Sequence, residues 1–148
     1  MKKRIATTLG AFTIAVLVTA CDNEVSLPYE GAWAMDAGKS IDASSNTFDM
    51  PREQFVFVME MWADAILNDV TIQSDGFVVD GDLEGDSFSI SCNFDNTSSS
   101  QASGPCNLAL GDDSTTESVT WSYVNNDSDE RLVGEGLEKM VIVLTRTN

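Results

Sequence analysis

The feature that most constrains the fold is a series of short apolar or alternating segments, which begins near residue 70 and continues to the end of the chain. Clusters of Ser, Asp, Asn and Gly interrupt the segments at short intervals. Alternation with a period of two is typical of half-buried β-strands, and such clusters are typical of turns. Short links between successive strands favour an antiparallel meander. The expected strands are residues 70–73, 77–83, 88–94, 107–110, 118–124 and 140–146.

Residues 53–68 follow a different pattern, with apolar side chains at helical spacing on one face and charged ones on the other. Pro51 precedes them at a position where its missing N–H does no harm to a helix. We therefore expect an amphipathic helix of four to five turns, in which Phe57 is the one apolar side chain on the polar face. A strand through 55–58 is the alternative, because β-branched and aromatic residues favour strands, but the longer helical pattern outweighs it.

Residues 31–36 are expected to form a first strand, and the small residues of 38–46 a loop. Together these segments predict a mainly antiparallel β protein, a six- to seven-stranded meander or half-open barrel with one amphipathic helix after the first strand. The length suits a single domain with one core. We expect no second domain.

The amino terminus has the layout of a secretion signal. Lys2, Lys3 and Arg4 precede sixteen uncharged residues, Ile5–Ala20, a stretch shorter than the roughly 20 residues that span a membrane. Val18-Thr19-Ala20-Cys21 resembles the lipobox of bacterial lipoproteins, whose cysteine carries the lipid. The resemblance implies a signal peptide at 1–20, lipidation at Cys21, a tether at 21–30 and a globular domain at 31–148. Ordinary cleavage with a free thiol, or an uncleaved anchor, is the alternative.

The same resemblance implies a place in the cell envelope. Two or more acyl chains hold a protein stably at a bilayer, so the membrane would be its first partner. In enteric-type bacteria, lipoproteins with Asp after the lipidated cysteine tend to stay in the inner membrane, and Asp22 stands at that position. The periplasmic face of the inner membrane is therefore the favoured location, with the outer membrane as the alternative.

Cys92 and Cys106 remain once Cys21 is assigned to lipid. A polar, turn-forming segment separates them, and in an oxidising compartment such a pair forms a disulfide. A redox role would favour a closer Cys-x-x-Cys spacing, which is absent.

Charge and composition exclude several functions. Without the signal, five basic residues face 24 acidic ones, a formal charge of −19 that repels nucleic acid and anionic headgroups. The chain contains no histidine, so the commonest general base and most zinc sites are missing. No phosphate-binding glycine loop occurs. We expect no enzyme, no cofactor and no catalytic residue.

One acidic segment, Asp80-Gly81-Asp82-Leu83-Glu84-Gly85-Asp86, has carboxylates and a glycine spaced like the opening of a calcium loop. Ser91 stands where such a loop has its bidentate glutamate. A solvated hairpin turn is the favoured interpretation, and we assign no metal site.

Gly31-Ala32-Trp33 resembles the Gly-x-Trp opening strand of lipocalins, in which the tryptophan closes one end of a barrel under a basic residue of the last strand. The resemblance implies that Arg146 is that residue here. The lipobox, tether, opening strand, helix and meander together also look like small uncharacterised envelope lipoproteins, whose likeness brings no established activity.

Two functions follow from these features. The first is a non-catalytic protein-interaction domain that holds a periplasmic partner, with Phe57 as an exposed anchor. The second is a lipocalin-like module for a small apolar ligand. It would be lined by Phe55, Met59, Trp62, Phe77 and Phe88, the same residues that would fill a dry core, and the dry core is favoured.

Overall fold

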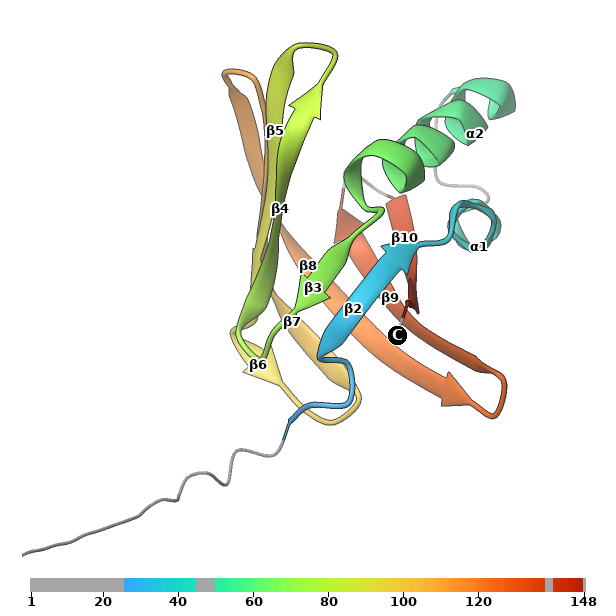
Figure 1. Ribbon diagram of the computed structural model, residues 1–148, viewed down its shortest axis with the longest axis vertical. Coiled ribbons are helices and arrows are strands. Elements are labelled where there is room, and N and C mark those ends of the chain that lie inside the picture. Colours follow the sequence, from blue (N-terminus) through green and yellow to red (C-terminus); the bar gives the residue numbers. More distant parts are fainter. Residues whose placement is uncertain (1–25, 45–49, 138–139, 148) are drawn as a thin grey trace, which may run out of the picture.

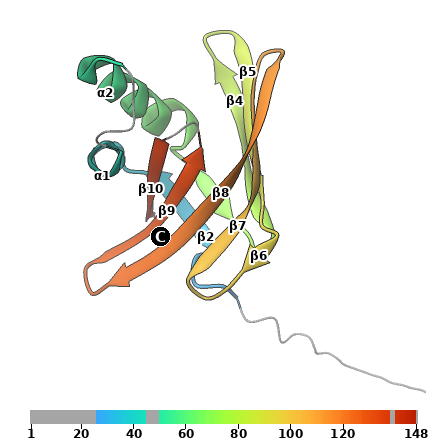
Figure 2. The same ribbon diagram turned by 180° about the vertical axis from the view of Figure 1, so that it is seen from behind.

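A computed structural model of the protein describes residues 26–44, 50–137 and 140–147. The described residues form one antiparallel sheet of nine strands, with two α-helices and a π-helical turn beside it (Figures 1 and 2). The prediction of a mainly antiparallel β protein is confirmed. Its strands are β2 (Gly31–Met35), β3 (Val70–Ile72), β4 (Gly76–Leu83), β5 (Asp86–Asn93), β6 (Asn96–Thr97), β7 (Gln101–Leu110), β8 (Asp113–Asn126), β9 (Asp129–Leu137) and β10 (Met140–Arg146).

The sheet is barrel-like and nearly closed. Its strands pair in the order β3-β2-β10-β9-β8-β7-β5-β4, and the short strand β6 pairs with β7. The two edge strands, β3 and β4, are consecutive in the chain, so the turn between them brings opposite edges of the sheet together at a single bridge, Gln73 with Gly76. Above this bridge the two edges separate (Figure 1). One end of the barrel is therefore closed, and the other end opens toward the helices.

The expected number of strands, six or seven, was too low. The structure adds β6 and β9, and it extends β7 and β8 well beyond the expected 107–110 and 118–124. The sequence hides β9 because two glycines interrupt its apolar residues. At Gly134 a β-carbon would lie 2.3 Å from the Trp121 ring, and Gly136 has φ +117°. The fold therefore requires both glycines. Gly134 makes room for a core aromatic ring, and Gly136 adopts a backbone conformation that residues with side chains disfavour.

The helical region also differs from the expectation of one helix. Helix α1 (Ala37–Ala43) occupies part of the expected loop, and helix α2 (Arg52–Met61) continues into the π-helical turn η1 (Trp62–Ile66). The single predicted helix thus corresponds to α2 and η1, and α1 is additional. Asp36 caps α1, because its side chain accepts a hydrogen bond of 2.9 Å from the backbone N–H of Lys39.

Helix α1 completes the hydrogen bonding of strand β10. Strand β2 pairs with β10 only from Leu144 onward, which leaves the earlier N–H groups of β10 without a strand partner on that side. The backbone N–H of Val143 donates to the Ser40 hydroxyl at 2.8 Å, and that of Val141 donates to the Ser44 hydroxyl at 2.9 Å. Both serines are buried. Two small polar residues, which the sequence analysis placed in a loop, therefore cover an edge of the sheet.

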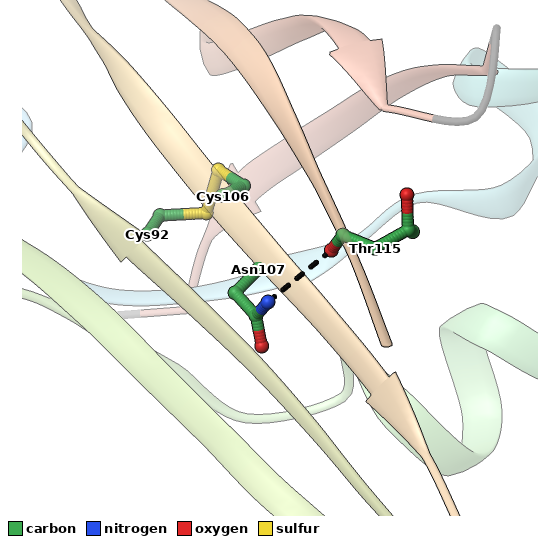
Figure 3. Close-up of a disulfide and its surroundings, with 4 residues drawn as sticks. All are labelled: Cys92, Cys106, Asn107 and Thr115. Atoms are coloured by element: carbon green, nitrogen blue, oxygen red, sulfur yellow. Dashed lines mark hydrogen bonds between the residues drawn. A yellow bond between two sulfur atoms is a disulfide. The ribbon is translucent and has the colours of Figure 1, made fainter. Parts of the chain in front are cut away.

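The core lies inside the curve of the sheet and is closed by the helices. One cluster joins buried side chains from nearly every element, including Trp33, Phe55, Trp121 and Leu144. Cys92 and Cys106 lie opposite each other on β5 and β7 and form a disulfide, as expected (Figure 3). On the neighbouring strand pair, the Asn107 side chain donates to the Thr115 carbonyl at 3.4 Å. The disulfide therefore fixes the register of two central strands.

Candidate functional site

An apolar groove lies at the open end of the barrel, between the α2–η1 helix and the end of the β7–β8 hairpin. Its volume is about 490 Å³, which falls in the range of roughly 300–1,000 Å³ that is usual for ligand sites. Asp113, Ser114 and Thr115 line its polar side. Six residues form its apolar lining: Val58, Trp62, Leu108, Ala109, Leu110 and Met140.

A second hollow adjoins the groove along helix α2. Val58 lines both, and Met50, Glu53, Gln54 and Phe57 complete the second. The Phe57 side chain is 66% exposed, which confirms its predicted place on the polar face of the helix. Leu110, across the groove, is 48% exposed. The open end of the barrel thus presents a continuous apolar surface, which we call the groove surface, running from Met50 and Phe57 over Val58 to Trp62 and Leu110.

The five residues expected to line a ligand site separate into two groups. Phe55, Met59, Phe77 and Phe88 are buried members of the core cluster, where they pack against other apolar side chains. Trp62 is only partly buried and lines the groove. Trp62 is therefore the one expected ligand residue that the structure places at an accessible apolar surface.

Sequence reasoning missed the strand residues of the groove. Leu108 and Leu110 come from β7 and Met140 from the start of β10, so no local pattern brings them together with the helix. One signal was present: Leu110 is apolar immediately before the turn Gly111-Asp112, where a solvated hairpin would favour a polar residue. An exposed leucine beside a turn is a reason to look for a partner surface.

Carboxylates border the groove surface. Asp113 lines the groove and Glu53 the adjoining hollow, while Asp112 lies exposed in the turn beside Asp113. Arg52, on the first turn of α2 next to Glu53, is the one cation at this end among the described residues, and it lies on another side of the helix from Phe57 because the two are five residues apart. With three border carboxylates and one arginine, the described charge around the groove surface is negative on balance.

The opposite end of the barrel is closed by Trp33 and Arg146. Arg146 pairs with Trp33 across β10 and β2, and its guanidinium carbon lies 4.4 Å from the centre of the fully buried indole ring. Arg146 also donates to the backbone carbonyls of Glu30 and Pro28, and it forms an ion pair of 2.8 Å with Glu130. The predicted position of Arg146 over Trp33 is thus present in the structure.

Three of the four basic residues that the structure describes gather at this closed end. Lys39 contacts Asp36 and Asp129, Arg131 pairs with Asp129, and Arg146 pairs with Glu130. The hydrogen bond from Arg146 lowers the pKa of Glu130, and the reciprocal interaction raises the pKa of Arg146. These cations are all compensated by carboxylates, so we infer a structural role for them.

The amino-terminal segment enters the domain at the same closed end (Figure 1). Tyr29, in the segment expected to be tether, is fully buried, and its hydroxyl donates to the Ser98 carbonyl at 2.8 Å. Burial raises the pKa of Tyr29. The groove surface and the point where the chain enters the domain therefore lie at opposite ends of the barrel. The signal, Cys21 and most of the tether fall outside the described residues.

The acidic segment Asp80–Asp86 belongs to the hairpin of β4 and β5. Glu84 and Gly85 form its turn, both with positive φ, and Asp80 and Asp82 lie exposed along β4. Within the described part of the chain, no three potential ligand side chains gather in a way that could hold a metal ion.

Comparisons with known proteins give no relative for this chain. No protein-family model, curated protein or solved structure matches it. In the described part of the chain, no helix has both the length and the apolar character needed to cross a bilayer.

Proposed function

We propose that this chain is a lipid-anchored envelope protein whose β domain binds another protein through the groove surface, without catalysis. The observation that carries the proposal is the exposure of two apolar side chains on neighbouring hollows that share Val58: Leu110 in the groove and Phe57 in the adjoining hollow. Exposed apolar side chains that form one surface indicate an interaction site far better than the same side chains scattered singly. Aromatic side chains such as Phe57 and Trp62 are enriched at the centre of protein interfaces.

The proposed anchor at Cys21 gives this surface a direction. Four residues lie between Cys21 and Ser26, the first described residue, and an extended chain over these five Cα–Cα steps spans at most about 18 Å. The closed end, where residues 26–30 join the barrel, would therefore lie near the membrane. The groove surface at the other end would face the periplasm, where a protein can reach it.

We also propose that the barrel is lipocalin-like, and the residues of its closed end support this. The Gly31-x-Trp33 strand, Arg146 over the Trp33 ring and a nearly closed antiparallel sheet occur together here. In this interpretation the barrel is a stable platform, and its open end carries the binding residues.

Photo-crosslinking from single positions tests the proposal. A photoreactive phenylalanine analogue replaces Phe57 in one variant and Val78 in another, because the two side chains are similarly exposed, 66% and 62%, on different elements. Irradiation of cells is expected to give a discrete adduct from position 57 and none from position 78. Adducts from both positions, or from neither, would refute a specific interface at the groove.

A small apolar ligand is the second candidate, and the volume of the groove with Trp62 in its lining favours it. The neutral dye Nile red provides the test, since its emission rises in apolar sites. This candidate predicts saturable emission that is lost in Trp62→Asp and retained in Val78→Asp. Emission equal in both variants would count against a ligand site in the groove.

A further inference from the structure

From the charges around the groove surface, we infer that its partner is a cationic amphipathic segment of another protein, with apolar side chains in the groove and Lys or Arg at its edge. This inference rests on the proposed function and names the chemistry of its partner. It follows from the way apolar and charged residues are divided between the two ends of the barrel.

The apolar part of the partner is set by the groove. Trp62, Leu108, Leu110 and Met140 come from a helix turn and two strands, and together they leave room for several side chains. Phe57 extends this surface along helix α2. An amphipathic segment, with apolar side chains repeated along one face, fits an elongated surface of this kind.

The carboxylates at the border of the groove determine which charge the partner should carry. Glu53, Asp112 and Asp113 stand there, and none of them has an ion-pair partner among the described residues. The cations Lys39, Arg131 and Arg146 lie at the closed end, where carboxylates already neutralise them. Arg52, beside Glu53, is the one described cation outside the closed end, so the three carboxylates leave the border with net negative charge, which attracts a basic partner and increases its association rate.

The same charges disfavour the other occupants of the groove. A fatty acid would bring its carboxylate to a border of carboxylates. A second copy of this chain would bring the same acidic border and, in the mature form, a formal charge of −19. Like charges placed together across an interface oppose binding. A basic segment is the occupant that both the apolar lining and the border favour.

The test uses the whole mature chain with Cys21→Ser, secreted behind a cleavable signal so that it carries no lipid. Fluorescence anisotropy compares a labelled amphipathic peptide of leucine and lysine with counterparts in which glutamate or serine replaces lysine. The lysine peptide is expected to bind, more weakly as salt shortens the screening length. The glutamate peptide is expected not to bind, and Leu110→Asp should abolish binding of the lysine peptide.

Two matched variants then locate the charges. Glu53→Gln with Asp112→Asn and Asp113→Asn removes the border charges, and Asp75→Asn with Asp95→Asn and Asp127→Asn removes three exposed charges elsewhere. Both change the net charge equally. The border variant should weaken lysine-peptide binding by about tenfold, which corresponds to about 1.4 kcal/mol shared among three exposed pairs. The control should differ from the wild type by less than about twofold on the same basis.

The possible results separate the inference from the proposed function. Equal binding of the serine or glutamate peptide, or equal loss in both charge variants, overturns the basic partner. Failure of the lysine peptide to bind overturns it as well, and an adduct from position 57 in the crosslinking experiment would then leave the interaction surface standing. If position 57 gives no adduct and no peptide binds, the proposed function and the inference both fall.

Discussion

The guanidinium of Arg146 lies over the ring of Trp33, with 4.4 Å between the guanidinium carbon and the ring centre. The two residues are register partners on β10 and β2, so the contact joins the last strand of the chain to the first described one. The same guanidinium reaches back to the carbonyls of Glu30 and Pro28. One side chain thus closes the barrel end and holds the entering chain in place.

Removing this side chain should destabilise the domain. Arg146→Ala loses the contact with Trp33, two hydrogen bonds to the backbone and an ion pair, and we expect a loss of about 2 kcal/mol in the free energy of unfolding. Arg131→Ala is the control, because it removes a partly exposed ion pair, worth at most about 1 kcal/mol. Urea unfolding followed by tryptophan fluorescence measures both. Equal losses in the two variants would show that the Trp33 contact adds nothing.

Gly134→Ala should also destabilise the fold, since the new β-carbon would lie 2.3 Å from a carbon of the Trp121 ring. Overpacking of a core usually costs about 1–3 kcal/mol. Gly38→Ala provides a control of opposite sign, because Gly38 lies in helix α1, where a β-carbon meets no atom closer than 3.5 Å and alanine favours the helix. Thermal denaturation should show a lower melting temperature for the first variant and an unchanged or higher one for the second.

The disulfide should contribute measurably to stability. Cys92 and Cys106 are 14 residues apart, and closing a loop of that size contributes about 3 kcal/mol in the chain-entropy treatment. Cys92→Ala with Cys106→Ala should therefore lower the midpoint of urea unfolding and retain the β-sheet circular dichroism spectrum. An unchanged midpoint would mean that hydrogen bonding between β5 and β7 alone fixes this part of the sheet.

Acid should weaken the closed end of the barrel. The hydrogen bond from Arg146 holds the pKa of Glu130 below its usual 4.5, and the backbone N–H of Lys39 holds the pKa of Asp36 below its usual 3.8. A lowered folded-state pKa adds stability that is fully present above the unfolded-state value and is lost as the pH falls through the folded-state value. The melting temperature should therefore decrease as the pH is lowered from about 4.5. In Glu130→Gln the melting temperature should depend less on pH. An identical acid profile in Glu130→Gln would contradict this assignment.

The parts of the fold that the sequence predicts well are those with uninterrupted local patterns. Strand β10 matches its expected bounds, Met140–Arg146, because its apolar run contains no breaker. Strand β9 was missed because Gly134 serves the Trp121 ring on a neighbouring strand, a requirement that no local pattern expresses. Helix α1 was missed because small residues read as loop until Ser40 and Ser44 are seen to bind the edge of β10.

The candidate site was less predictable for the same reason. Trp62 and Phe57 lie on one helix and could be singled out from its periodicity, whereas Leu108, Leu110 and Met140 join them only through the closure of the sheet. Phe55, Met59, Phe77 and Phe88 have the same apolar character as groove residues, and only packing assigns them to the core. The sequence shows that a residue is apolar, but it does not show whether that residue faces the core or the groove.

Native mass spectrometry shows directly whether the barrel and its groove hold a small molecule, which they should not do if the groove surface serves to bind a protein. The mature chain with Cys21→Ser, secreted behind a cleavable signal and purified without detergent, is compared with its own denatured mass. The expected result is one bare monomer, lighter than the reduced sequence by the two hydrogens of the Cys92–Cys106 disulfide. Extra mass that disappears on denaturation would contradict it and would identify a bound small molecule in the barrel.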